Sequence, residues 1–215
     1  MLPFIFSDRS EGLRLLLIGA HCDDIEIGCG GTIMRLKKEY KIKAVKWVVF
    51  TSNSIRAGEA RKCANVFLEG ITSAAVDILE LRDGHLPFVG TKVKEHFEDL
   101  KAFQPDVIFT HARHDRHQDH KLLAEMTWNT FRDHTIMEYE IPKYEGDLGH
   151  PNVFVTIPQP MAEAKANAIV EGYPSQSNKQ WFDKETFLSL MRIRGLECAS
   201  ATRYAEGFYV SKAVI

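Results

Sequence analysis

The chain has 215 residues, 27 of them basic and 29 acidic, and a formal net charge of −2. This length suits one α/β domain with its own core, and the balanced charge argues against nucleic acid or a membrane surface as the main partner. No apolar run approaches the roughly 18 residues of a membrane span. The opening segment MLPFIFSDRSEGLR lacks a basic start and soon turns polar, so no secretory leader is expected. The four cysteines show no C-x-x-C pair, which is typical of free thiols in the cytoplasm.

Apolar runs and helical patterns alternate along the first part of the chain. Strands are expected at 13–20, 44–50, 75–81 and 105–110, and helices at 28–40, 56–70, 92–103 and 119–131. This alternation predicts a mostly parallel sheet with helices on both faces.

The pattern changes after residue 138. Further strands are expected at 137–142, 152–157 and 207–215, with helices at 161–172 and 184–195. We interpret the whole chain, 1–215, as a single domain with a core at about 13–131 and a C-terminal extension at about 138–215.

Groups suited to metal binding follow two of the expected strands. His21, Asp23 and Asp24 come directly after the first strand, and HARHDRHQDH, at 111–120, follows the fourth. Because ligands bind at the carboxyl ends of parallel strands, the two clusters are expected to meet across one crevice. Two histidines and a carboxylate would hold a divalent metal and a water, whose pKa zinc lowers to about 7. The spacing leaves open which aspartate and which histidine complete the set.

Each cluster taken alone has a plainer explanation. Adjacent aspartates also suit a helix N-terminus, and histidines three residues apart also form a solvated helix face. Two clusters at two strand ends are harder to explain in that way. The Gly-rich GCGGT does not fit G-x-G-x-x-G, because Ile33 holds the third glycine position, so close packing at a helix start is favoured over a dinucleotide site. Cys22 and Cys29 have the wrong spacing for a standard zinc site, which favours packing roles.

Longer motifs resemble those of the PIG-L/LmbE family. AHCDDIEIGCGGTI is similar to the family signature A-H-P-D-D-x-x-x-G-x-G-G-T, and HQDH is similar to its H-x-D-H motif. Arg56 with Glu59, DGHLP, YPSQ and RGLECASATRYAEGFYV also resemble family elements, so the likeness runs from about residue 14 to the end. It implies a Rossmann-like three-layer α/β sandwich. It also implies metal-dependent, usually zinc-dependent, removal of N-acetyl groups from amino-sugar conjugates.

The resemblance assigns a role to each matching residue of the first motif and to the last histidine of the second. His21, Asp24 and His120 would bind Zn²⁺ or another divalent cation such as Fe²⁺. Asp23 would be the general base on the attacking water. The substrate would be a small N-acetylated sugar or sugar conjugate, and the family often forms oligomers, which leaves a homo-oligomer open.

Three further residues take supporting roles by the same resemblance. His117 would stabilise the oxyanion or act as acid, Asp119 would orient a histidine, and Arg56 would contact the substrate or its oxyanion. Cys22 replaces the usual proline, which affects loop rigidity. Ile25 stands where glutamate often follows the aspartate pair, with Glu26 nearby.

Four other side chains have less defined expectations. His111 and His114 match nothing in the family pattern and are expected to face solvent or line the pocket mouth. Trp181 or Tyr173 would stack on a sugar ring, or else pack in the core.

Three alternative functions stay open. A non-haem iron oxygenase would use His21-x-Asp23 with His120, although that class typically sits on an all-β barrel. A non-catalytic nucleotide- or sugar-binding module would use the Gly-rich turn. A metal hydrolase of another bond in a small sugar derivative, such as a phosphoester, would use the same ligands.

Overall fold

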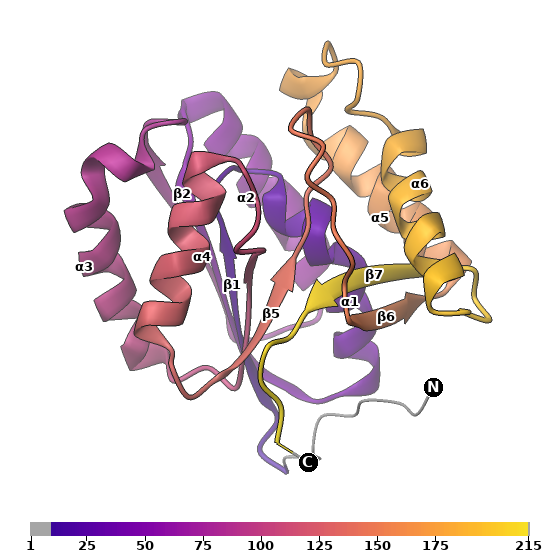
Figure 1. Cartoon of the computed structure of the whole chain (residues 1–215), viewed down its shortest axis with the longest axis horizontal. Coiled ribbons are helices and arrows are strands. Elements are labelled where there is room, and N and C mark those ends of the chain that lie inside the picture. The colour runs from indigo at the N-terminus through magenta and orange to yellow at the C-terminus, as the bar shows by residue number, and fades with distance from the viewer. Residues whose placement is uncertain (1–9, 215) are drawn as a thin grey trace.

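The structure is a computed structural model that describes residues 10–214. One seven-stranded sheet runs through the molecule in the order β3-β2-β1-β4-β5-β7-β6 (Figure 1). The strands are β1 (Leu13–Gly19), β2 (Ile42–Thr51), β3 (Ala74–Leu81), β4 (Val107–His111), β5 (Thr135–Tyr139), β6 (Val153–Ile157) and β7 (Tyr204–Tyr209). Residues 1–9, most of the opening segment, and Ile215 lie outside the described residues.

Six α-helices and three short 3-10 helices connect the strands of the described part. They are α1 (Asp24–Glu39), α2 (Ser54–Leu68), η1 (Leu86–Val89), α3 (Gly90–Leu100), η2 (Lys101–Phe103), α4 (Gln118–Thr130), α5 (Gln159–Gly172), η3 (Pro174–Gln176) and α6 (Lys184–Glu197). Within residues 10–214, no helix is both long and apolar enough to cross a membrane.

The first five strands are parallel, as the alternating pattern predicts. β1 pairs with β2 and β4, β2 pairs with β3, and β4 pairs with β5, all in parallel. β7 is antiparallel to both of its neighbours, β5 and β6, so the closing segment of the chain inserts between them. The fold is therefore the expected Rossmann-like α/β domain with a mostly parallel sheet.

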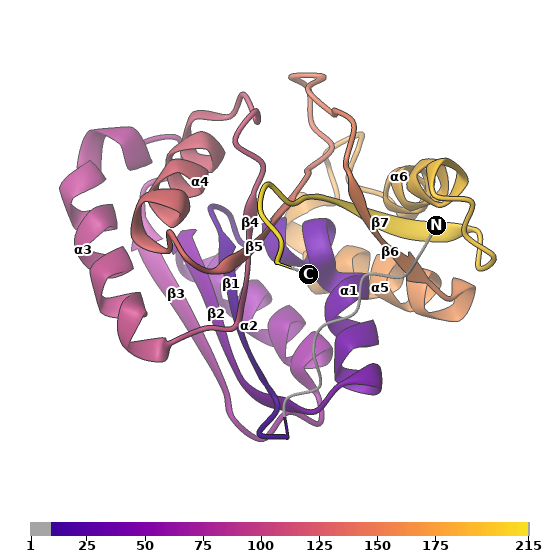
Figure 2. The same ribbon diagram turned by 60° about the horizontal axis from the view of Figure 1, so that its bottom comes forward.

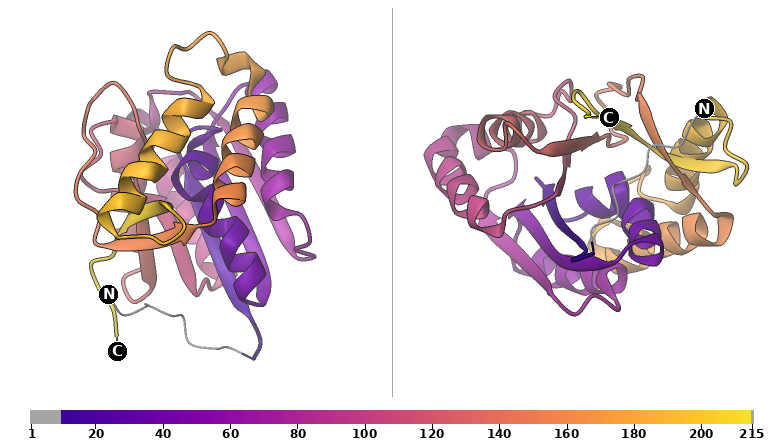
Figure 3. Two further views of the ribbon diagram at one scale, coloured as in Figure 1. Left: turned by 90° about the vertical axis from the view of Figure 1, so that its right-hand side faces the viewer. Right: turned by 90° about the horizontal axis from the view of Figure 1, so that it is seen from below.

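Helices cover both faces of the sheet, which gives three layers (Figures 2 and 3). Alternate residues of β1 enter opposite cores: Leu15 and Leu17 pack with side chains of α1, α2 and α5, and Leu16 and Ile18 pack with side chains of α3 and α4. This alternation follows from the two-residue period of a strand. Because both faces are buried, β1 reads in sequence as the continuous apolar run LRLLLIG.

Helix α1 begins at Asp24, four residues before the expected start at Gly28. Three glycines within it, Gly28, Gly30 and Gly31, are buried, and a Cβ at Gly28 would collide with the ring of Tyr139. Gly28 and Gly31 therefore let the helix approach the sheet closely, as expected, whereas Gly30 faces Phe67 of α2. Tertiary packing thus overrides their low helix propensity.

A buried ion pair contacts the backbone of α1. Glu206 of β7 accepts hydrogen bonds from the amides of Gly31 and Thr32, at 2.8 and 2.6 Å. Lys165 of α5 donates to Glu206 at 2.6 Å and to the carbonyl oxygen of Ile27 at 2.7 Å. We call Lys165 and Glu206 the α1 clamp. It connects the C-terminal extension to the helix on which the site is built.

Candidate metal centre

The candidate site lies where the strand order reverses, between β1 and β4. The chain runs outward in one direction from β1 to β3 and in the other from β4 to β5, and such a switch point leaves a crevice at the carboxyl ends of the strands. The connection from β1 into α1 carries His21, Asp23 and Asp24, and the start of α4 carries Asp119 and His120. The two motifs, about a hundred residues apart in sequence, therefore meet in space as expected.

Three donor atoms of the expected ligand residues face one another. His21 Nδ1 lies 3.0 Å from His120 Nε2 and 3.3 Å from Asp24 Oδ2, and the remaining pair is 3.5 Å apart. Bonds of about 2.0–2.1 Å in a tetrahedral zinc site would place ligand atoms roughly 3.3 Å from one another. The triangle of donors therefore has the size of one face of such a site, and the residues present fit a divalent cation.

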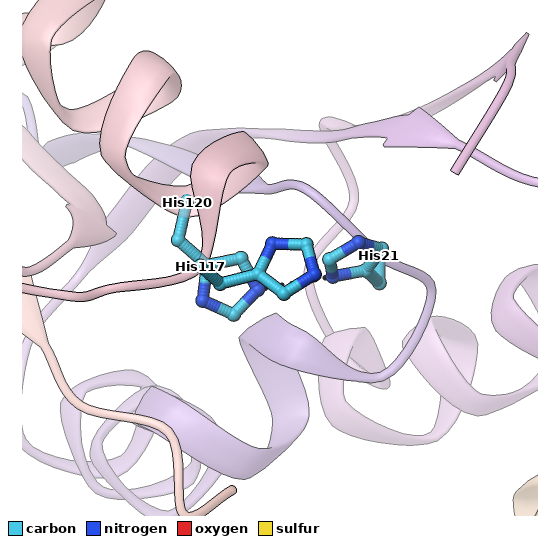
Figure 4. A group of neighbouring side chains, drawn as sticks. All are labelled: His21, His117 and His120. Carbon is cyan, nitrogen blue, oxygen red and sulfur yellow. Dashed lines mark hydrogen bonds between the residues drawn. The ribbon is translucent and has the colours of Figure 1, made fainter. Parts of the chain in front are cut away.

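His117 lies beside this triangle. Its ring centroid is 4.7 Å from that of His21 and 4.6 Å from that of His120, and Figure 4 shows the three rings gathered together. Donor atoms of these three histidines all lie within 4.8 Å of one another. His117 precedes α4, and its Nδ1 accepts the amide of Asp119 at 3.3 Å. His117 is thus within reach of anything bound by the other two histidines.

The charges in the cluster support a carboxylate that stays ionised. Burial raises the pKa of Asp24, but His120, His21 and His111 more than offset this and hold it well below its usual range. Burial lowers the pKa of His120, and His111 lowers it further. Burial also lowers the pKa of His117, with His120 and His21 adding to the effect. Burial lowers the pKa of His21, but Asp24, Asp119 and Asp83 more than offset this and raise it well above its usual value. The cluster thus pairs an anionic carboxylate with imidazoles, and a divalent cation would bind there by displacing the proton of His21.

Each ligand histidine has a carboxylate next to its other ring nitrogen. His120 Nδ1 lies 2.8 Å from Asp115 Oδ2. His21 Nε2 lies 3.1 Å from Asp83 Oδ1 and 3.5 Å from Asp119 Oδ2. A carboxylate in this place fixes the tautomer and leaves the opposite nitrogen free for a metal. Asp119 therefore lies next to a histidine as expected, and that histidine is His21.

Sequence reasoning did not assign Asp83 and Asp115. Asp83 opens the turn after β3, and its contact with His21 lowers its pKa to about 2. The same turn is joined to the site a second time, because Asp119 accepts the amides of Gly84 and Leu86 at 2.7 and 3.1 Å. The signal in the sequence was the position of Asp83 at a strand end, within DGHLP.

Asp23 does not join the donor triangle. Its Oδ1 accepts a hydrogen bond from Arg56 Nη2 at 2.7 Å, and both side chains line the same cavity as His21. Arg56 comes from the first turn of α2, which Asn53 caps through its side chain. Arg56 was expected to contact the substrate, and in the structure its partner is the carboxylate of Asp23.

The expectation for His111 is wrong. Its side chain is fully buried rather than at the surface or mouth. β4 extends through His111, whose ring stacks on that of His120 with centroids 3.8 Å apart. Its Nε2 accepts the amide of Ala20 at 3.0 Å and lies 3.2 Å from Asp24 Oδ2. His111 therefore packs against the cluster on its buried side. His114 faces solvent, as expected, with its ring edge-on to Tyr209.

The cluster opens into a cavity of about 280 Å³. Besides the donor triangle, the cavity is lined by Asp23, Arg56 and His117 and by residues 141–145 with Lys179 and Trp181. Tyr173 is not part of it, because its ring is fully buried and its hydroxyl donates to Glu26 at 2.6 Å. Trp181 therefore remains as the candidate for contact with a ligand.

The four cysteines are all buried and free, as expected, and Cys22 and Cys29 pack in the core.

The fold and the site together define a class: α/β proteins with a doubly wound sheet and a candidate metal centre of histidines and aspartates at its switch point. The chain belongs to the PIG-L family, since the family model described as "GlcNAc-PI de-N-acetylase" matches residues 16–131. The matched segment contains every residue of the donor triangle. The family resemblance of the motifs is thereby confirmed.

Relatives by sequence and by structure agree with this assignment. "Uncharacterized deacetylase YaiS" of Escherichia coli (strain K12) is 30% identical over 154 residues, which cover 64% of this chain and 79% of that protein. The N,N'-diacetylchitobiose deacetylase from Pyrococcus horikoshii has a TM-score of 0.72 and 22% identity, with coverage of 93% of this chain and 84% of that one.

Two further solved structures share the fold. The conserved protein TT1542 from Thermus thermophilus has a TM-score of 0.74 and 20% identity, covering 94% of this chain and 96% of that one. GalB, the 4-carboxy-2-hydroxymuconate hydratase from Pseudomonas putida KT2440, has a TM-score of 0.72 and 14% identity, covering 94% and 98%. The fold thus also carries a hydratase, so the reaction must be argued from the site.

Proposed function

We propose that this protein is a metal-dependent hydrolase that removes the N-acetyl group from an amino sugar or amino-sugar conjugate. The observation that carries the proposal is the donor triangle of His21, Asp24 and His120, with Asp23 beside it in an open cavity. The family and its deacetylase relatives support the same reaction. Zinc is the proposed cation, with another divalent ion such as Fe²⁺ as the alternative.

The proposed ligands are His21, Asp24 and His120, which together leave one side of the triangle open to the cavity. A divalent cation bound there would polarise the acetamide carbonyl and acidify the attacking water. Asp115 and Asp83 would hold the two imidazoles with their donor nitrogens turned inward. Asp119 would assist Asp83 at His21.

Asp23 is the proposed general base. It lies in the cavity, outside the donor triangle, and Arg56 holds one of its oxygens, which leaves the other to accept a proton from water. Arg56 would therefore position the base, and its charge would also lie near the oxyanion. His117, which lines the cavity, would stabilise that oxyanion as a hydrogen-bond donor, and the leaving amine would take up the proton that Asp23 removed from the water. Acetate and the free amine are the products.

The position of Asp23 also separates this proposal from an iron oxygenase. An H-x-D…H triad would need Asp23 to share a metal with His21 and His120. Among the described residues, three groups have donor atoms within 4.8 Å of one another; Asp23 belongs to none of them, whereas Asp24 groups with His111 and His120. The geometry therefore favours a hydrolytic centre with a separate base.

The test combines metal content with acetate release from N-acetylglucosamine, N,N'-diacetylchitobiose and phosphorylated sugars. We expect bound divalent metal, loss of acetate release after chelation, and recovery with Zn²⁺. Asp23→Asn should keep the metal but lose about 10²- to 10⁴-fold in kcat, the range of general acid–base catalysis. Asp24→Asn should instead lose the metal. Asp77→Asn, which changes an aspartate paired with Lys46 at the edge of the sheet, is the matched control and should change neither.

Three results would contradict the proposal. They are acetate release that survives chelation, full turnover by Asp23→Asn, and release of phosphate or consumption of oxygen in place of acetate release. The first would rule out the metal, the second the general base, and the third the reaction itself.

A further inference from the structure

Two segments of the C-terminal extension form the outer wall of the cavity. Residues 141–145 belong to the connection between β5 and β6, and Lys179 and Trp181 belong to the connection between η3 and α6. Both connections rise beyond the carboxyl edge of the sheet (Figure 1). Each presents one aromatic side chain near the cavity: Tyr144 and Trp181 both line it.

Trp181 is held in place by the core. Its ring meets those of Phe182 and Phe187 at steep angles, 66° and 88°, with centroids 5.5 and 6.5 Å away. Both phenylalanines are buried members of the core that α1, α2 and α5 share. Trp181 is only half-buried and lines the cavity, so part of its indole stays uncovered by these rings. Lys179 Nζ lies over the indole ring in a cation–π contact, 5.7 Å from its centroid, so the ammonium group borders the place where a ligand ring would sit and could meet its hydroxyl groups.

Tyr144 is held by its neighbour in sequence. Lys143 is largely buried and donates to Asp115 at 2.9 Å and to Asp147 at 2.6 Å. Asp115 is also the carboxylate at His120, so the segment with Tyr144 is anchored to the metal centre. The Tyr144 side chain is nevertheless 74% exposed. An exposed aromatic ring on an anchored segment offers contact area at little cost in conformational entropy.

The charges at the wall favour an uncharged ligand. Arg56 is paired with Asp23, and Lys143 with Asp115 and Asp147. The two outer charges that line the cavity, Lys179 and Glu145, have opposite signs. A phosphate or nucleotide would call for several unpaired cations on this wall, since anion sites use convergent Arg and Lys side chains.

We propose that Trp181 and Tyr144 form a binding site for the uncharged pyranose ring of the substrate, with Lys179 as a donor to its hydroxyl groups. This platform is the size of one sugar ring and lies next to the donor triangle. The proposal rests on the proposed function, because the bound ring would carry its acetamide to the donor triangle. The cavity volume of about 280 Å³ lies just below the roughly 300–1,000 Å³ of pockets that enclose drug-sized ligands. It therefore takes the acetylated ring, while the rest of a conjugate extends outward past Tyr144.

The test measures binding and specificity separately. Binding of N,N'-diacetylchitobiose and of N-acetylglucosamine 1-phosphate is measured by calorimetry in the Asp23→Asn background, which prevents turnover. Acetate release from N,N'-diacetylchitobiose and from the acyclic N-acetylethanolamine is measured in the active protein. The variants are Trp181→Ala, Trp181→Phe and Tyr144→Ala. Leu196→Ala, which removes an equally exposed side chain from α6, is the matched control.

We expect Trp181→Ala to weaken disaccharide binding by at least about tenfold, equal to about 1.4 kcal/mol. Its kcat/KM ratio of disaccharide over acyclic acetamide should fall by a similar factor. Trp181→Phe should keep most of the binding, Tyr144→Ala should lose part of it, and Leu196→Ala should lose none. Metal content should stay constant throughout.

Two outcomes would overturn the platform: unchanged disaccharide binding in Trp181→Ala, or much tighter binding of the phosphorylated sugar that depends on Lys179. Failure of the proposed function looks different. In that case no acetamide releases acetate, while disaccharide binding still depends on Trp181 and the platform stands.

Discussion

Asp115 offers the sharpest test of how the candidate centre is supported. Its Oδ2 lies 2.8 Å from His120 Nδ1 and 2.9 Å from Lys143 Nζ, and its Oδ1 accepts the amide of His117 at 2.8 Å. Burial raises the pKa of Asp115, but His120, His111 and Lys143 more than offset this and hold it well below its usual range. The group is therefore an anion across the pH range in which the protein would bind metal.

The change Asp115→Asn keeps the shape of the side chain and removes its charge. Losing a carboxylate behind a ligating histidine typically weakens metal binding 10- to 100-fold, or about 1.4–2.7 kcal/mol. We expect an effect within this range, because the substitution weakens the polarisation of His120 and leaves the buried ammonium of Lys143 with one fewer counter-charge. The assay is competition for Zn²⁺ with a chromophoric chelator, which reports affinity without turnover.

Asp147→Asn is the matched control, because Asp147 pairs with the same lysine, Lys143, as Asp115 does. We expect it to change the Zn²⁺ dissociation constant by less than about threefold. Equal effects of the two substitutions would mean that Lys143 and its segment, and not the contact with His120, control affinity. An unchanged affinity in Asp115→Asn would refute the proposed support of His120 by Asp115.

Two stability predictions concern residues outside the donor triangle. Gly28→Ala would drive a Cβ into the ring of Tyr139, so overpacking should lower the free energy of unfolding by about 1–3 kcal/mol in urea titrations. Gly58→Ala, where nothing lies within 4 Å, is the control, and equal losses would disprove the close-approach argument. Burial lowers the pKa of His96 below 6.5, so its contribution to stability is present above that pH and is lost as the pH falls through the folded-state pKa. His96→Gln should therefore reduce the loss of stability between pH 7.5 and pH 5, and an identical loss would contradict this.

The layout of the sheet was predictable because each buried strand reads as an apolar run and each surface helix has its own period. The strand-end rule also brought His21 and His120 to one crevice without any knowledge of their distance. The placement of β7 was not predictable, because its antiparallel pairing with β5 depends on contacts between segments far apart in sequence. The start of α1 was expected four residues too late, because Asp24 was read as part of the connection after the strand, whereas it is both the first residue of the helix and a member of the donor triangle.

The burial of His111 could not be predicted from the sequence pattern. In sequence it is one of four evenly spaced histidines, and nothing local separates it from His114. In the structure, one more residue of β4 buries His111, while the turn that follows exposes His114. Asp83 was overlooked because its partner, His21, lies about sixty residues away, and only the neighbouring ends of the strands join them.

The α1 clamp means that the family-matched segment does not stand alone. All proposed ligands precede residue 121, yet the ion pair that hydrogen-bonds the backbone of α1 is formed by Lys165 and Glu206. A fragment ending near residue 131 would keep the whole donor set but lose the Glu206 carboxylate that Gly31 and Thr32 donate to. A chimera that received only this segment from a relative would therefore contain the ligand histidines without the ion pair that supports α1. Substitutions at Lys165 or Glu206 would likewise affect the metal centre without contacting it.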